Sequence, residues 1–198
     1  MKTVALPVCP PMLQRPSAHF DDRPPGEEIS LLVIHNISLP AGDFATAPQQ
    51  GCPVDSLFCG TLDCSLHPSF VSLQGVRVAA HCVIWRDGTI FQYVPFANRA
   101  WHAGKSEFAG RANCNDFSIG IELEGCDNMP YTEQQYQSLI ALSHYLLARY
   151  QQLKPERIVG HCDIAPGRKT DPGPAFDWSY YRANIKAVVQ ATRMESRE

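Results

Sequence analysis

The feature that most constrains this chain is one uninterrupted apolar run in its N-terminal third. Residues 31–38 read LLVIHNIS, in which four aliphatic residues precede the polar ones. A short run of apolar and β-branched residues that ends in polar ones is typical of a buried strand. We therefore expect a central strand here, and other segments must supply the strands and helices that cover it.

Further segments have the patterns of strands. Residues 76–85 (VRVAAHCVIW) and 89–94 (TIFQYV) are joined by Arg86-Asp87-Gly88, and Asp-Gly between two such runs predicts a hairpin. Residues 117–125 (FSIGIELEG) alternate, so that one face carries aliphatic side chains and the other carries Gly120, Glu122 and Glu124. Residues 157–161 (RIVGH) predict one more strand, which runs into a polar loop.

Two segments have the periodicity of helices. Residues 132–150 begin with Thr132 and Gln135, which fit a capping box, and repeat apolar residues at helical spacing. A second helix is expected from about Asp177, a possible N-cap, to Arg193. Strands mixed with these helices indicate the α/β class: a single domain at residues 31–193, with a central mixed β-sheet flanked by α-helices, after an irregular arm at residues 1–30.

Residues 39–69 form a long segment rich in Pro, Gly and Ser between two expected strands. A connection of this length inside a compact domain is usually functional or mobile. We therefore expect this segment to be functional or mobile.

Composition excludes several classes of function. The 198 residues carry a net charge of −3, from 17 basic and 20 acidic residues, and no basic block indicates a nucleic-acid partner. The sequence has no run of about 18 apolar residues that could span a membrane. Prolines 7, 10 and 11 interrupt the apolar run of a possible signal peptide, so a cytoplasmic location is expected. The eight cysteines include no C-x-x-C pair and are expected to be reduced thiols.

Two of the seven histidines follow apolar runs at expected strand ends. His35 and His161 have this position, and Asp171 follows ten residues after His161, beyond a loop rich in glycine and proline. Two imidazoles and one carboxylate from separate elements suit a catalytic zinc with one open position. Spacing alone is weak support, since no H-E-x-x-H motif occurs. His19, His67 and His144 have ordinary structural explanations.

A zinc hydrolase also needs a proton shuttle and a cation for the developing oxyanion. Glu122 lies in the middle of an apolar alternating strand, and Lys169 lies two residues before Asp171. From position alone, Glu122 could equally be a solvent-facing strand residue and Lys169 a surface lysine.

Five motifs together give a specific resemblance: LLVIHNISLP, RVAAHCVI, AWHAG, CNDFSIGIELEG and GHCDIAPGRKTDPGPAFDW. The chain resembles the zinc amidases that hydrolyse N-acetylmuramoyl-L-alanine bonds, in particular the 1,6-anhydro type, from about Leu31 to Trp178. The resemblance implies the fold of the peptidoglycan recognition proteins. It implies Zn2+ held by His35, His161 and Asp171.

The resemblance also implies the other roles in the site. Glu122 would be the acid/base residue, and Lys169 would stabilise the tetrahedral intermediate. The substrate would be an anhydro-muropeptide, and the enzyme would act as a monomer in peptidoglycan recycling. Positions that match the groove of these amidases are Asn36, Arg77, Trp101 and Arg168.

One departure from the family is visible. Asn113 stands where a second arginine is expected, and Arg111 is the nearest candidate to compensate. The segment 39–69 is also a few residues longer than expected, which could alter access to the groove.

Four alternative functions make different demands on the sequence. A non-catalytic peptidoglycan-binding module of the same fold would typically lack a zinc ligand. A secreted amidase would need a credible signal peptide. A zinc nucleoside deaminase would need H-x-E with P-C-x-x-C, which is absent. A cysteine hydrolase that uses Cys162 or Cys82 remains possible from the sequence.

Overall fold

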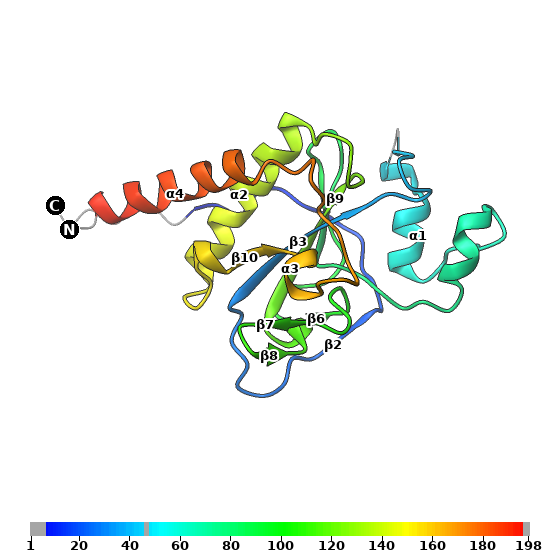
Figure 1. The fold of residues 1–198 in the computed structure, drawn as a ribbon, viewed down its shortest axis with the longest axis horizontal. Coiled ribbons are helices and arrows are strands. Elements are labelled where there is room, and N and C mark those ends of the chain that lie inside the picture. Colours follow the sequence, from blue (N-terminus) through cyan, green and yellow to red (C-terminus); the bar gives the residue numbers. More distant parts are fainter. Residues whose placement is uncertain (1–6, 46–47, 196–198) are drawn as a thin grey trace.

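The structure, a computed structural model, describes residues 7–45 and 48–195. Its centre is a six-stranded sheet in the order β1-β5-β4-β9-β3-β10 (Figure 1). The strands β4, β9, β3 and β10 are parallel, β5 is antiparallel to β4, and β1 is parallel to β5. The predicted mixed sheet and α/β class are therefore confirmed. The bounds are β1 Leu13–Gln14, β3 Leu31–Ile37, β4 Cys82–Ile84, β5 Ile90–Gln92, β9 Ser118–Glu124 and β10 Ile158–Gly160.

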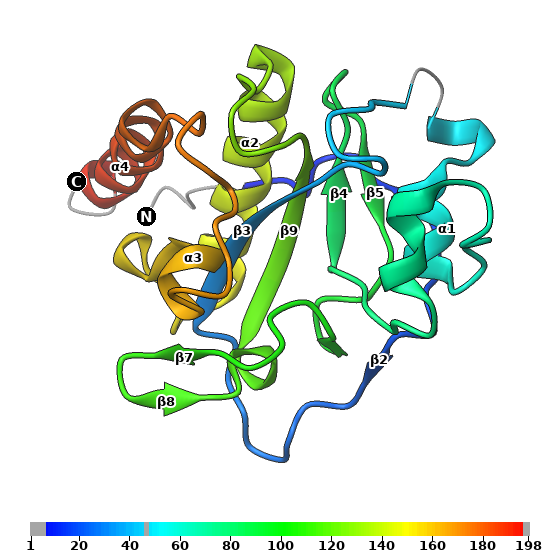
Figure 2. The same ribbon diagram turned by 45° about the vertical axis from the view of Figure 1, so that its right-hand side comes forward.

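One face of the sheet is covered by two long helices, α2 (Glu133–Arg149) and α4 (Trp178–Glu195), which contact each other (Figure 2). Alternate residues of β3 and β9, including Ile34 and Ile121, point to this face and pack in one cluster with Leu139 of α2. The aliphatic half of the 117–125 alternation therefore forms the main core, as predicted.

The opposite face is covered in two separate patches. At one end, Leu31 and Val33 of β3 pack with Ile164 of α3 (His161–Ile164). At the other end, Val83 of β4 packs with Phe58 of α1 (Pro53–Cys59). Figures 1 and 2 show α1 and α3 standing apart over this face. Polar side chains of β3 and β9 lie between the two patches.

The register between β3 and β9 decides which polar side chains meet. All seven residues of β3 pair with the seven residues of β9, and His35 pairs with Glu122. Because paired residues of neighbouring strands point to the same face, the imidazole and the carboxylate lie side by side.

The arm at residues 1–30 is not irregular throughout. Its first six residues lie outside the described part, but β1 extends the central sheet, and β2 (Phe20–Asp21) pairs with β6 (Arg99–Ala100). Arg23 of the same segment donates to the backbone carbonyls of Asn115 and Ser118. The segment thus packs onto the domain, and the boundary at residue 30 stays a prediction.

The segment 39–69 is more ordered than its composition suggests. It contains a 3-10 turn, η1 (Pro48–Gln50), and the helix α1, which starts after Cys52 and ends at Gly60 with φ 75°. Pro53 suits the first helical position and glycine suits the left-handed end, so residues that read as loop signals here mark the ends of a helix.

The remaining elements are short. A second hairpin pairs β7 with β8, and three further 3-10 turns connect the larger elements. Their bounds are η2 Pro68–Leu73, β7 Glu107–Phe108, β8 Arg111–Ala112, η3 Cys114–Asp116 and η4 Pro155–Arg157. No helix in the described ranges has the length and apolar character needed to cross a membrane.

The local signals predicted from the sequence are confirmed. Thr132 and Gln135 form the capping box of α2, and Asp177 accepts a hydrogen bond from the backbone N–H of Tyr180 at the start of α4. The Asp-Gly turn joins β4 to the antiparallel β5, and Gly88 has φ 85°.

Gln135 also links α2 to the sheet. Its amide nitrogen donates to the backbone carbonyls of Ile84 at 3.1 Å and Glu124 at 2.9 Å, where β4 and β9 end. We predict that Gln135→Leu lowers the free energy of unfolding by about 2–4 kcal/mol, because two buried carbonyls lose their donor. Gln137→Leu, on the exposed side of the same helix, is the control and should change it by less than about 0.5 kcal/mol. Equal denaturation midpoints for the two variants would contradict the prediction.

Candidate functional site

Three candidate metal ligands converge on the sheet face between α1 and α3. Nδ1 of His35 lies 2.9 Å from Nδ1 of His161 and 3.0 Å from Oδ2 of Asp171, and Nδ1 of His161 lies 3.1 Å from the same oxygen. One donor atom from each residue lies within 4.8 Å of the other two. The predicted set of two imidazoles and one carboxylate is therefore brought together as a possible metal site.

His161 reaches the site in a different way than expected. It is not at a strand end: β10 stops at Gly160, and His161 is the first residue of α3. Gly160 pairs with Ile34, so His161 comes next to His35. The backbone N–H of Cys162 then donates to the carbonyl of Asp171 at 3.0 Å, which folds the loop back onto the start of the helix.

Burial keeps His35 neutral, whereas hydrogen bonds keep Asp171 ionised. His35 is 1% exposed, and burial lowers its pKa to about 4, against the influence of Asp171. Burial alone would raise the pKa of Asp171, but its hydrogen bonds with His161 and His35 hold that pKa well below its usual range. A neutral imidazole and an ionised carboxylate are the forms that bind a divalent cation, so the donor set fits a zinc ion.

Glu122 stands beside this cluster as a buried carboxyl group. It is 8% exposed, and its Oε2 has no hydrogen-bond partner among the described residues. Burial, followed by the negative charge of Asp171, raises its pKa well above the usual value, and Lys169 opposes this shift. A desolvated carboxyl group with a free oxygen in a cavity is the pattern of a proton-transfer residue, not of a solvated strand face.

These side chains share one cavity of about 260 Å³. Its lining includes the three candidate ligands together with Asn36, Trp101, Glu122 and Lys169. Its apolar walls come from α1 and from the segment before β4. One cavity therefore contains the three candidate metal ligands, the buried carboxyl group of Glu122 and the ammonium group of Lys169.

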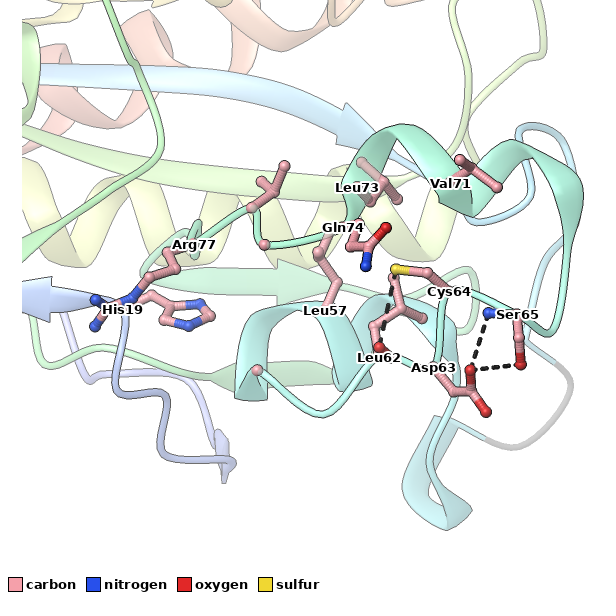
Figure 3. A pocket seen from close by; sticks show the side chains of 13 residues that line it. His19, Leu57, Leu62, Asp63, Cys64, Ser65, Val71, Leu73, Gln74 and Arg77 are labelled. Atoms are coloured by element: carbon pink, nitrogen blue, oxygen red, sulfur yellow. Dashed lines mark hydrogen bonds between the residues drawn. The ribbon is translucent and has the colours of Figure 1, made fainter.

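A larger cavity of about 760 Å³ adjoins the first (Figure 3). The two cavities share the side chains of Leu57, Leu73 and Val76. Arg77 lines the larger one, and its guanidinium lies 5.2 Å from the ring centre of Trp101 in the smaller one. The site thus continues into a groove between α1 and η2, formed by the long segment 39–69 and the residues after it.

The four candidate substrate-binding residues have different surroundings. Trp101 donates from its indole N–H to Asp21 at 3.0 Å, and Asn36 donates to Asp127 at 2.9 Å. Arg168 does not line either cavity; its guanidinium donates to the backbone carbonyls of Ala103 and Lys105, both at 2.7 Å. The roles of all four in substrate binding stay predictions.

Arg111 is engaged elsewhere. It forms an ion pair with Glu27 and lies over the ring of Phe117. It lines a separate surface cavity, away from Glu122 and the three candidate ligands. In this structure it does not replace the arginine expected at Asn113.

Sequence reasoning missed two histidines near the candidate ligands: His81 is fully buried, and His102 is half-buried and lines the same cavity as the ligands. Nδ1 of His102 lies 2.9 Å from Nε2 of His35, and Nδ1 of His81 accepts from the backbone N–H of Gly120 at 3.0 Å. Burial lowers the pKa of His102 well below its usual value and that of His81 to about 3. Both histidines lie in the motifs RVAAHCVI and AWHAG, which mark the positions without assigning a role.

The two cysteines of the alternative hydrolase are poorly suited to act as nucleophiles. Cys82 points into the core that α2 covers, and burial raises its thiol pKa. Burial also raises the thiol pKa of Cys162. A reactive cysteine needs a lowered pKa, because the thiolate is the nucleophile.

Comparisons with known proteins agree on one family. Residues 25–174 match the N-acetylmuramoyl-L-alanine amidase family. The 1,6-anhydro-N-acetylmuramyl-L-alanine amidase AmpD of Salmonella typhimurium (strain SL1344) is 56% identical over 170 residues, which cover 86% of this chain and 88% of that protein. The crystal structure of a selenomethionine derivative of AmpD has a TM-score of 0.83 at 51% identity and covers 92% of this chain and 98% of that one.

A more distant structure contains a bound substrate. The Escherichia coli amidase AmiD, in complex with anhydro-N-acetylmuramic acid-L-Ala-D-γ-Glu-L-Lys, has a TM-score of 0.57 at 28% identity. The match covers 85% of this chain and 66% of that one.

The raised pKa of Glu122 predicts a pH-dependent cost to the metal-free protein. Between the unfolded pKa of 4.5 and the higher folded pKa, the folded state keeps a proton that the unfolded state has lost. Stability therefore falls as pH rises through this window, by up to about 1.4 kcal/mol per pH unit. We predict that Glu122→Gln makes the chelator-treated protein more stable than wild type at pH 7 and leaves the two alike at pH 4. Denaturant unfolding at both pH values checks this, and a stability difference that does not depend on pH would contradict it.

Proposed function

The chain belongs to the N-acetylmuramoyl-L-alanine amidase family, and we propose that it hydrolyses the amide bond between the lactyl group of 1,6-anhydro-N-acetylmuramic acid and L-alanine. The reaction would release the anhydro-sugar from its stem peptide during peptidoglycan recycling. The Salmonella typhimurium relative is named for this activity, and the match covers 86% of this chain and 88% of that protein.

One observation carries the proposal. A possible metal site of His35, His161 and Asp171 and the unpartnered carboxyl group of Glu122 line one cavity. A binding module would need neither three convergent ligand side chains of this kind nor a buried carboxyl group whose pKa is raised. Both features cost folding free energy and are typical of hydrolytic sites.

We propose Zn2+ as the cofactor, held by Nδ1 of His35, Nδ1 of His161 and Oδ2 of Asp171. Three protein ligands of these types are the usual set for a catalytic zinc with one open position. A zinc ion bound there supplies a Lewis acid for the scissile carbonyl and makes its coordinated water more acidic.

Glu122 and Lys169 would carry the other parts of the reaction. Glu122 takes a proton from the attacking water and gives it to the leaving amine of L-alanine, so that a carboxylic acid and an amine result. Lys169 favours the ionised form of Glu122 that the first step needs, and a cation held by the three ligands would do the same. The ammonium of Lys169, an exposed residue that lines the cavity, would compensate charge on the tetrahedral oxygen.

The adjoining cavity gives the rest of a muropeptide a place to bind. Such a ligand carries several carboxylates, and Arg77 lines that cavity while it also contacts Trp101. We propose that Asn36 and Trp101 contact the part of the substrate near the scissile bond and that Arg77 binds a carboxylate of the stem peptide. Arg168 lines neither cavity, and we propose that it supports substrate binding indirectly, through its hydrogen bond to the backbone carbonyl of Ala103.

We further propose that the enzyme works as a monomer in the cytoplasm. One chain supplies the metal cluster, the carboxyl group and the cation, so the site does not need a second copy. All eight cysteines are described, and none forms a disulfide, as suits a reducing compartment.

The proposal predicts a metal-dependent cleavage. Purified protein with added zinc should convert anhydro-muramyl tripeptide to free anhydro-sugar and tripeptide, and a chelator should abolish the reaction. Mass spectrometry of both products checks this. Absence of cleavage by the zinc-loaded protein would contradict the proposed activity, whereas cleavage that resists chelation would contradict only the metal.

Removal of the carboxylate should separate binding from chemistry. We expect Glu122→Gln to bind zinc as wild type does and to lose turnover by about 100- to 1000-fold, by analogy with the loss of one transition-state donor. Glu124→Gln is the matched control, since Glu124 lies on the same strand but accepts hydrogen bonds from the backbone of Ala45 and Arg86. Near-normal turnover of Glu122→Gln would remove Glu122 from the mechanism.

A further inference from the structure

His102 lies against one of the candidate metal ligands, lines the same cavity, and has no role in the chemistry described above. Its Nδ1 is 2.9 Å from Nε2 of His35, and its Nε2 is 3.0 Å from the hydroxyl of Ser118. The rings of His102 and His35 meet edge to face, at 87° and 5.0 Å between centres. His102 therefore bridges a candidate ligand and the strand β9.

The positions of the protons along this bridge follow from the donor atoms. Nδ1 of His35 faces His161 and Asp171, so binding of a cation there requires a free lone pair on Nδ1. The single proton of the neutral ring must then be on Nε2, which donates to Nδ1 of His102. The proton of His102 is consequently on its own Nε2 and is donated to Ser118.

Without this bridge, the opposite tautomer of His35 would be favoured. The ionised carboxylate of Asp171 lies 3.0 Å from Nδ1 and would accept a proton placed there. Such a proton blocks the lone pair that a metal needs. An acceptor on the far side of the ring is what holds the proton on Nε2, as is common for metal-binding histidines.

The strand β9 is shaped to hold His102 in this place. Ser118, Gly120 and Glu122 alternate along one face of it. Ser118 accepts from His102, and a Cβ built on Gly120 would overlap the imidazole of His102. The glycine at this position is thus explained by the close approach of the ring, and the next alternate residue is the carboxyl group of the site.

The neighbouring residue does the same for the second imidazole. Nε2 of His161 lies 3.2 Å from the backbone carbonyl of Ala103, which also accepts from Arg168 at 2.7 Å. Two consecutive residues therefore offer acceptors to the two candidate imidazoles. The side chain of His102 faces Nε2 of His35, and the backbone carbonyl of Ala103 faces Nε2 of His161.

We propose that His102 is a positioning residue that keeps the proton of His35 on Nε2 and so leaves Nδ1 free to bind the zinc ion. The inference rests on the proposed function, since it assumes that the cluster binds a metal. It assigns His102 to metal affinity and not to contact with the reacting atoms.

Three variants test this inference through zinc affinity, measured by competition with a chromophoric chelator. His102→Leu removes the acceptor and should weaken zinc binding by about 10- to 100-fold. His102→Asn offers an amide oxygen near the position of Nδ1 and should recover most of that loss. His81→Asn is the control for general damage to the packing around His102. The side chain of His81 forms hydrogen bonds with the backbone of Gly120 and Asn98 and with none of the three candidate ligands. This control variant should lower the thermal midpoint of the metal-free protein and leave zinc affinity unchanged.

The outcomes separate the two proposals. Wild-type zinc affinity in His102→Leu, or an equal loss in His81→Asn, would overturn the inference alone. A wild-type protein that binds no zinc would overturn the proposed metal site and the inference with it. Failure of His102→Asn to recover affinity beyond His102→Leu would show that shape, not the acceptor, matters and would also overturn the inference.

Discussion

The in-register pairing of β3 with β9 is the constraint on which the site depends. It places His35 opposite Glu122 and sets both on the sheet face that α2 and α4 do not cover. A slip of one residue in either strand would turn its polar side chain, His35 or Glu122, into the aliphatic core and bring Ile34 or Ile121 to the cavity. The aliphatic residues that alternate with the polar ones resist such a slip, because each contributes burial only in the observed register. The same hydrophobic pattern that stabilises the sheet therefore also keeps His35 and Glu122 side by side at the site.

Desolvation shifts the pKa values of the side chains that this pairing brings together. Within one enclosure, burial favours a neutral His35 and a protonated Glu122, while two imidazoles keep Asp171 ionised. A cation would bind the imidazoles and the carboxylate of Asp171 in these states, and only Glu122 would change, because positive charge favours its ionised form. Under the proposed function, the protonation of Glu122 would therefore depend on whether the metal is bound.

The sequence predicted those parts of the structure that depend on local pattern. The alternation in 117–125 identified both faces of β9, and the capping residues of α2 and α4 were found because their chemistry is local. The helix α1 was missed because short helices rich in turn residues gain their stability from packing, here against Val83 and Phe91. His161 was assigned to a strand end because it directly follows the apolar run of β10, whereas in the structure it is the first residue of α3. His102 could not be found by spacing, since only the fold brings AWHAG behind a strand that lies far from it in the chain.

The distribution of the metal ligands along the chain has a consequence for biosynthesis. Asp171 follows His35 by 136 residues, and the strand that brings His161 into place, β10, is the last of the sheet. A polypeptide still emerging from the ribosome cannot assemble the cluster until nearly all of the sheet has been synthesised. If the proposed zinc binds, it would therefore bind only after nearly all of the domain has been translated. The bound ion would then act as a crosslink between β3 and the loop that carries Asp171, and it would stabilise the folded chain against unfolding.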